Sequence, residues 1–166
     1  MKRKIIVIII VILCFVLQST LFQMLSIASI SPNLLIIATS SFGFMRGKKS
    51  GLLTGFFCGF LIDLFYGGTL GFYAMIYMYL GYLNGLFHKI FFPEDIKLPI
   101  ILITASDFVC NLLVYAFRFL LRGKFAFDYY LIHIIMPELV YTILVTVFLY
   151  FILLKVNQWL EAEERK

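Results

Sequence analysis

Long apolar runs alternate with short polar segments along the whole chain, and this pattern predicts six membrane-spanning helices. A spanning helix needs about 20 apolar residues. The predicted spans are residues 5–27, 32–45, 50–66, 70–91, 98–121 and 129–155. The second and third are short, because about 13 and 17 residues at a rise of about 1.5 Å each reach only about 20–25 Å. We expect neighbouring helices to shield them, or the bilayer to thin around them.

The polar segments indicate how these helices begin and end. Ser31 and Pro32 predict an N-cap and a first-turn proline for the second helix. The basic segment RGKK (46–49) ends that helix, and residues 67–69 predict a tight turn before the fourth. The N-terminus resembles a signal peptide but lacks a small-x-small cleavage site, so we expect an uncleaved first helix. The tail NQWLEAEERK after Lys155 is polar and amphipathic.

Glycines spaced four residues apart run through the middle of the chain. They are Gly43, Gly47, Gly51, Gly55 and Gly59, followed at the same spacing by Asp63, Gly67 and Gly71, with a further pair, Gly81 and Gly85, in the fourth predicted helix. Small residues at this spacing let two helix backbones approach closely in a bilayer. We therefore predict a close helix–helix contact, with the carboxylate at position 63 facing protein or water. The simpler alternative is that the glycines pack helices and do nothing else.

Composition and charge agree with a single membrane domain covering residues 1–166. Hydrophobic residues make up 63% of the chain, charged residues 14%, and the mean hydropathy is +1.01. The net charge of +5 does not indicate nucleic-acid binding, because its position follows the spans. With a cytoplasmic N-terminus, 11 of the 14 lysines and arginines fall on the cytoplasmic side. This bias predicts that both termini are cytoplasmic.

Four ionisable residues within the predicted spans are candidates for a buried polar role: Asp63, Asp107, Arg118 and Glu138. The fifth span carries a polar stripe with steps of three or four residues, which a helix places on one face. Its members are Thr104, Asp107, Asn111, Tyr115, Arg118 and Arg122. We expect this stripe to face the bundle interior or a partner, and Asp63 to pair with Arg118. Interfacial anchoring of Arg118, and helix packing by protonated Asp107 and Glu138, remain alternatives.

Other features bear on helix shape and on chemistry. Pro137 should kink the sixth helix and free a carbonyl near His133. Cys14, Cys58 and Cys110 lie far apart in apolar segments, without the spacing of a zinc site or a disulfide framework. The chain has no HExxH, GxSxG or phosphate-binding glycine loop. We therefore expect a protein that is not an enzyme and needs no cofactor or metal, although a lipid-handling enzyme or flippase is a further class.

An ordered set of segments resembles the MreD family of rod shape-determining membrane proteins. The set comprises LQSTLF (17–22), SPNLLII (31–37), GLLTGFFCGFLIDLFYGGTLG (51–71) and GYLNG (81–85). The most specific piece is the glycine-rich segment that ends in Asp63 and the two glycines of the following turn. The last two helices match only in hydropathy and length.

The resemblance implies an all-α, polytopic subunit of the cell-wall elongation machinery in the bacterial plasma membrane. Its implied partners are an MreC-like single-span scaffold protein and, further, a RodA-type glycosyltransferase with its transpeptidase. The family fold is related to the substrate-binding components of energy-coupling-factor vitamin transporters, and such a component is the alternative function. The first helix lacks the small residues that would dock a coupling subunit, which favours the scaffold role. We expect the polar stripe and the face with Tyr73 and Tyr77 to bind the partner.

Overall fold

The computed structural model describes residues 2–20, 24, 30–66, 69–119, 122–123 and 127–165 of the chain. These residues form six helical units and no β-strand. The helices are α1 (Lys2–Ser19), α3 (Leu34–Arg46), α4 (Lys48–Tyr66), α5 (Phe72–Leu86, followed by a 3-10 turn over Phe87–Ile90), α6 (Lys97–Arg118), and α7 (Phe127–Tyr130), which continues through a π-helical turn (Leu131–Ile135) into α8 (Met136–Glu164).

The helices follow the order that hydropathy predicts, but their lengths differ. Three of the described helices are long and apolar enough to cross a membrane: Lys48–Tyr66, Lys97–Arg118 and the continuous Phe127–Glu164. The last of these extends well beyond Lys155, so the polar, amphipathic tail is a helical continuation of α8. Most of the second half of the first predicted span lies outside the described residues.

Helix α3 forms the centre of the molecule. Every side chain from Leu34 to Met45 is buried. Helices α1, α4, α5, α6 and α8 all contact it. At 13 residues this helix is about 20 Å long, which is shorter than the hydrocarbon core of about 30 Å. The expectation that neighbours shield this short helix is confirmed, because no side of it is open to lipid.

The two ends of α3 are set by residues with special local geometry. Its N-cap is Asn33, whose side chain accepts a hydrogen bond from the Ile36 amide at 3.3 Å. The prediction of Ser31 as the cap was therefore wrong by two residues. The helix ends at Gly47, which adopts φ +92°. Because glycine takes this conformation without steric cost, one residue is enough to turn the chain from α3 into α4.

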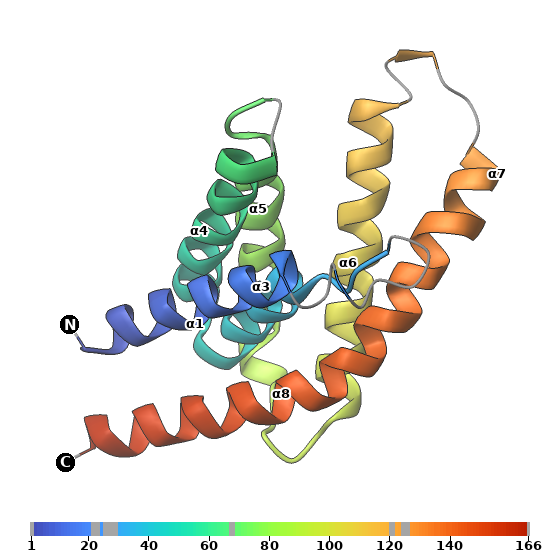
Figure 1. The fold of residues 1–166 in the computed structure, drawn as a ribbon. Coiled ribbons are helices and arrows are strands. Elements are labelled where there is room, and N and C mark those ends of the chain that lie inside the picture. Colours follow the sequence, from blue (N-terminus) through green and yellow to red (C-terminus); the bar gives the residue numbers. More distant parts are fainter. Residues whose placement is uncertain are drawn as a thin grey trace.

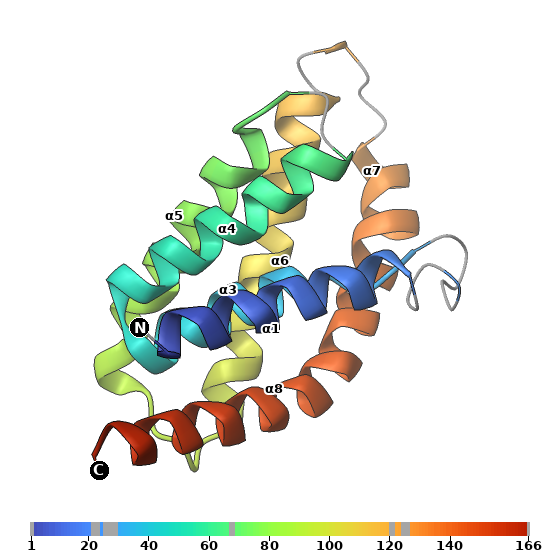
Figure 2. The same ribbon diagram turned by 60° about the vertical axis from the view of Figure 1, so that its left-hand side comes forward.

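The remaining helices pack around α3 with their axes along two different directions. Helices α4 and α5 lie side by side, with α6 next to them, whereas α1 runs across α3 and α4 and the C-terminal half of α8 runs along the bottom of the molecule (Figures 1 and 2). The start of α1 and the end of α8 lie on the same side of the molecule. They are joined by an ion pair between Arg3 and Glu164 at 2.8 Å.

The proline in the last helix coincides with a change of helix type. The π-helical turn Leu131–Ile135 ends two residues before Pro137. Proline has no N–H to donate to the carbonyl four residues earlier, and a wider turn at this point accommodates the missing bond. The disruption predicted near His133 is therefore present, and the long helix bends as it continues into α8 (Figure 1).

Candidate functional site

The glycines of α4 face the backbone of α5. A Cβ atom added at Gly55 would lie 2.7 Å from the carbonyl carbon of Tyr77, and one added at Gly59 would lie 2.5 Å from the Cα of Ala74. Real Cβ atoms are not found at such distances from backbone atoms. Gly51 is equally close to α5, at 2.8 Å from the carbonyl carbon of Gly81. The two helices therefore touch backbone to backbone.

The glycine pair of α5 completes this contact. A Cβ at Gly81 would lie 2.6 Å from the carbonyl carbon of Gly51, and one at Gly85 would lie 2.5 Å from the Cα of Lys48. Gly43 brings α3 into the same contact, because its Cβ would lie 2.8 Å from the Gly81 carbonyl oxygen. Three helices thus meet where their glycines coincide.

The glycines spaced four residues apart have two different roles. Gly43 belongs to α3, and Gly51, Gly55 and Gly59 belong to α4. Gly47 and Gly71 lie outside the helices, with φ +92° and +94°. Their positive φ angles turn the chain between helices. Gly67 lies outside the described residues.

Asp63 caps the beginning of α5. One carboxylate oxygen, Oδ2, accepts hydrogen bonds from the amides of Gly71 at 3.0 Å and Ala74 at 2.9 Å, and Oδ1 accepts one from Tyr73 at 3.1 Å. The carboxylate is buried, at 3% exposure. The first N–H groups of a helix have no partner within the helix, and its dipole favours negative charge at this end. Asp63 on α4 therefore satisfies the start of α5.

Arg118 does not pair with Asp63, so the predicted ion pair was wrong. The guanidinium carbon of Arg118 lies 5.2 Å from the centre of the Tyr73 ring, a cation–π arrangement. The three amides of α5 already take both oxygens of Asp63. The arginine therefore stays half-buried at the end of α6.

A second polar centre is built around Asn33, which the sequence analysis did not single out. Its Nδ2 donates to Asp107 Oδ1 at 3.3 Å, and its Oδ1 accepts from the Tyr77 hydroxyl at 2.8 Å. Its backbone N–H donates to Thr142 Oγ1 at 3.3 Å. One residue thereby links α3 with α5, α6 and α8. The available signal was an asparagine directly before an apolar run, a common N-cap position.

Half of the polar stripe is buried inside the bundle. Asp107, Asn111 and Tyr115 are buried, and Arg122 is exposed. Tyr77 of α5 is also buried, at 1% exposure. Of the two alternatives for the stripe, the bundle interior is therefore confirmed for its buried members, and these side chains and Tyr77 are not available as a surface for a partner. Tyr73 is half-buried.

The buried stripe borders a cavity of about 320 Å³. Asn33, Asn111 and Glu138 line it together with tyrosines from three helices: Tyr66, Tyr73, Tyr77 and Tyr130. Asp107 Oδ2 lies nearby, buried and without a hydrogen-bond partner among the described residues. Asp107, Asn111 and Glu138 are thus brought to one region, as their depths in the predicted helices suggested.

A third polar cluster links the middle of the same helices. The Asn84 side-chain amide of α5 donates to Ser106 Oγ at 2.7 Å and to Ser40 Oγ at 3.3 Å. Asn84 lies between the two glycines of GYLNG, so the close approach of α5 and α3 brings its amide within reach of Ser40, while Ser106 is supplied by α6. The sequence analysis missed this residue, whose signal was a buried-helix asparagine flanked by small residues.

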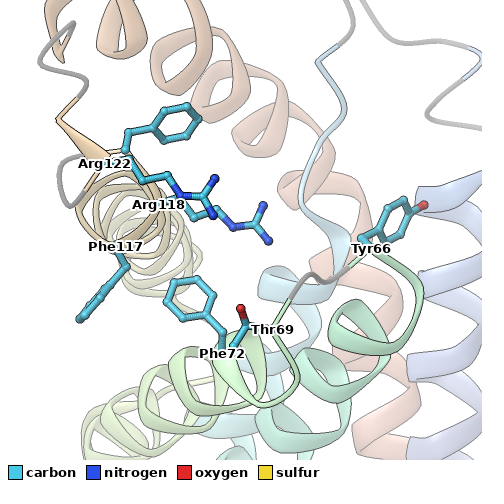
Figure 3. Close-up of a pocket in the computed structure, with 7 residues that line it drawn as sticks. Tyr66, Thr69, Phe72, Phe117, Arg118 and Arg122 are labelled. Carbon is cyan, nitrogen blue, oxygen red and sulfur yellow. The ribbon is translucent and has the colours of Figure 1, made fainter.

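An open pocket lies at the end of the bundle where α4 turns into α5 and α6 ends. Its volume is about 470 Å³, and its walls carry Tyr66, Thr69, Phe72, Phe117, Arg118, Phe119 and Arg122. Figure 3 shows the side chains of Arg118 and Arg122 extending into the space above Phe72 and Thr69. Both cationic groups therefore border one pocket that is otherwise largely aromatic.

Metal and thiol chemistry find no assembled site in the described part of the chain. No group of three or more His, Cys, Asp or Glu side chains there is placed to hold a metal ion. Cys14, Cys58 and Cys110 are free and buried. The geometry at hand is that of helix packing and polar bridging.

The relation of the chain to known proteins comes from a family model. No curated protein and no solved structure matches the chain. The relationship to vitamin-transporter components therefore stays a prediction. The sequence model described as rod shape-determining protein MreD matches residues 2–159, nearly the whole length. The chain belongs to the MreD family of rod shape-determining membrane proteins.

Proposed function

We propose that this protein is a non-enzymatic membrane subunit of the bacterial cell-wall elongation machinery that binds an MreC-like single-span scaffold protein. The observation that carries the proposal is the family match over residues 2–159. The described helices also join through short connections, which leave little chain for a catalytic domain outside the membrane. A RodA-type glycosyltransferase and its transpeptidase are further partners in the same proposal.

In this proposal all six helices span the plasma membrane, with both termini in the cytoplasm. The ion pair between Arg3 and Glu164 supports a common side for the two ends. Arg46 and Lys49, at the junction of α3 and α4, lie with Arg3 around the same cavity. Clustering of basic residues on one side is what the positive-inside rule associates with the cytoplasm. The opposite end then carries the pocket with Arg118 and Arg122.

That outer pocket is the proposed contact for the partner. A scaffold whose folded part lies outside the cytoplasm must leave the membrane at this end. Arg118 and Arg122 offer two positive groups, and Phe72, Phe117 and Phe119 offer aromatic surface between them. Arginines and aromatic side chains are enriched among residues that dominate binding energy. The fitting ligand is an acidic or aromatic segment of the partner next to its single span.

Co-purification tests this contact. The tagged protein is co-expressed with the MreC-like protein of the same cell, and partner recovery is measured from detergent extracts. We expect the double substitution Arg118→Ala and Arg122→Ala to lower recovery about tenfold, equivalent to about 1.4 kcal/mol. The control, Lys89→Ala with Lys97→Ala, removes two exposed charges elsewhere and should leave recovery unchanged. Equal recovery from both variants would exclude the outer pocket.

The wider role is tested in cells. Depletion of the protein should delocalise wall synthesis and give rounded cells, while isolated wall enzymes keep their activities. The alternative is a vitamin-binding transporter component, and the cavity beside Asn111 and Glu138 is the one feature that favours it. Tight, saturable binding of a vitamin-like ligand by purified protein, without recovery of an MreC-like partner, would establish the alternative and end the proposal.

A further inference from the structure

A groove with both basic and apolar walls opens between the first halves of α1 and α4. Its volume is about 620 Å³. The start of α1 lies beside the start of α4 in Figure 2. The lining residues come from four helices: Arg3, Lys4, Val7, Ile8 and Val11 of α1, Arg46 of α3, Lys49, Ser50, Leu53, Thr54 and Phe57 of α4, and Glu164 of α8. The glycine contact and the partner pocket use other faces.

The charges of the groove are strongly unbalanced. Four basic side chains border it, against one acidic side chain, Glu164. Both oxygens of Glu164 are bound by Arg3, at 3.0 and 2.8 Å. Lys4, Arg46 and Lys49 have no further acidic side chain in the lining of the groove, and Glu161, which interacts electrostatically with Arg46, lies outside that lining. An anionic group is the missing complement.

Arg46, which lines the groove, has a hydrogen-bond donor without a partner among the described residues. Its Nε donates to Asn157 Oδ1 at 2.6 Å, which fixes the guanidinium. The guanidinium carbon lies 5.0 Å from the centre of the Phe42 ring. The Nη2 atom is buried and has no hydrogen-bond partner among the described residues. An unpaired buried donor is costly, and a guanidinium is well shaped to bind two oxygens of a phosphate.

The apolar part of the groove begins one turn beyond the basic part on both helices. Lys4 is followed by Val7, Ile8 and Val11 on α1, and Lys49 by Leu53 and Phe57 on α4. Leu53 and Phe57 are exposed, at 52% and 44%. The groove is therefore open sideways toward the bilayer.

A soluble anion would use only the basic end of such a groove. A phospholipid uses both ends, because its phosphate lies at the membrane surface and its acyl chains continue into the hydrocarbon. The positively charged N-terminus of the α4 helix, at Lys48 to Ser50, adds to the attraction for a phosphate. Basic pockets between helices on the cytoplasmic side are a general solution for binding anionic lipid headgroups.

We infer that the α1–α4 groove binds one anionic phospholipid of the cytoplasmic leaflet, with its phosphate between Lys4, Arg46 and Lys49 and its acyl chains along Val7, Leu53 and Phe57. The choice of leaflet rests on the topology in the proposed function. The lipid binding itself does not depend on an MreC-like partner, so the two proposals can fail separately.

The test uses the full chain purified in a mild nonionic detergent. Phosphatidylglycerol or phosphatidylcholine with identical acyl chains is added. Native mass spectrometry counts the bound lipid molecules, and the shift in unfolding temperature measures how far they stabilise the protein. We expect one phosphatidylglycerol to be retained and to stabilise the protein, with phosphatidylcholine binding at least tenfold more weakly.

The variant Lys4→Gln with Lys49→Gln removes two exposed groups and should fold normally. At roughly fivefold per basic residue near the surface, it should weaken phosphatidylglycerol binding by about 30-fold. The control Lys89→Gln with Lys97→Gln has the same charge change elsewhere. A second variant, Leu53→Ser, tests the acyl-chain wall and should also weaken binding.

Three results would overturn the inference. The first is equal binding of the two lipids, and the second is wild-type affinity in the Lys4/Lys49 variant. The third is full stabilisation by inorganic phosphate alone, which would indicate a site for a free anion. If the Arg118/Arg122 variant loses partner recovery but still binds the lipid, the two sites are independent, and that result bears only on the outer pocket.

Discussion

Replacement of Asp63 offers the sharpest test of how this bundle is held together. The carboxylate accepts three hydrogen bonds from the amides of Gly71, Tyr73 and Ala74. In Asp63→Asn the single remaining acceptor oxygen can occupy the Oδ2 position and keep two of them. The new NH₂ group then faces the Tyr73 N–H, donor against donor. In Asp63→Ala all three bonds are lost.

The magnitudes follow from these counts. A hydrogen bond to a charged group contributes about 1.5–3 kcal/mol, so Asp63→Asn should lower the free energy of unfolding by about that amount. Three such bonds set an upper bound of about 4.5–9 kcal/mol for Asp63→Ala. Gly71 and Tyr73 are only half-buried, and water can hydrate their amides in the variant. We therefore expect a loss of about 3–5 kcal/mol.

Unfolding by sodium dodecyl sulfate in mixed micelles, followed by circular dichroism, measures these differences. Asp95→Asn is the matched control. The Asp95 carboxylate also accepts a backbone hydrogen bond at the start of a helix, but only one, from the Lys97 amide at 3.0 Å, and it is exposed. Its replacement should cost less than about 1 kcal/mol. If Asp63→Asn is no more destabilising than the control, the cap does not stabilise the α4–α5 pair and the reasoning is refuted.

Three further predictions concern packing, the polar hub and topology. Gly59→Ala should destabilise by about 1–3 kcal/mol through overpacking against Ala74, whereas Leu64→Ala on the exposed face of α4 should be nearly neutral; equal effects in thermal unfolding would contradict the close contact. Asn33→Ala should lower the free energy of unfolding by about 2–4 kcal/mol, because it leaves buried groups of Asp107 and Tyr77 without their hydrogen-bond partner. Wild-type stability in this variant would show that Asn33 does not hold the helices together. A Lys48→Cys variant should react with an impermeant maleimide only in permeabilised cells, and labelling of intact cells would invert the topology.

Hydropathy predicted the order of the helices, because each long apolar run avoids water by forming a helix in the membrane, whatever its neighbours are. It also predicted that α3 is short, whereas α4, with 19 residues, is long enough to cross a membrane. It could not give the end of the last helix. Asn157 and Leu160 are buried although they lie in a polar segment, because Asn157 receives the Arg46 hydrogen bond across the bundle. Such a contact between residues far apart in sequence leaves no local signal.

The partners of polar residues were harder to predict than their positions. Asp63 was expected to be buried, and it is, but its charge is balanced by backbone amides a few residues ahead and not by Arg118. A cap of this kind depends on how the chain turns between α4 and α5, which composition does not reveal. Tyr77 has an amphipathic side chain that suits either a surface or a core, and only the position of Asn33 decides between them.

The enclosure of α3 has a consequence for how the protein is made. Thr39, Ser40 and Ser41 lie on three successive positions of this helix, and all are buried by helices on every side. While the ribosome is still synthesising α5, α6 and α8, those covers are absent, and three hydroxyl groups would face hydrocarbon or the translocon wall. Stable residence of α3 in the bilayer therefore depends on segments translated after it. Insertion of this segment and folding of the bundle are one coupled event, completed late in synthesis.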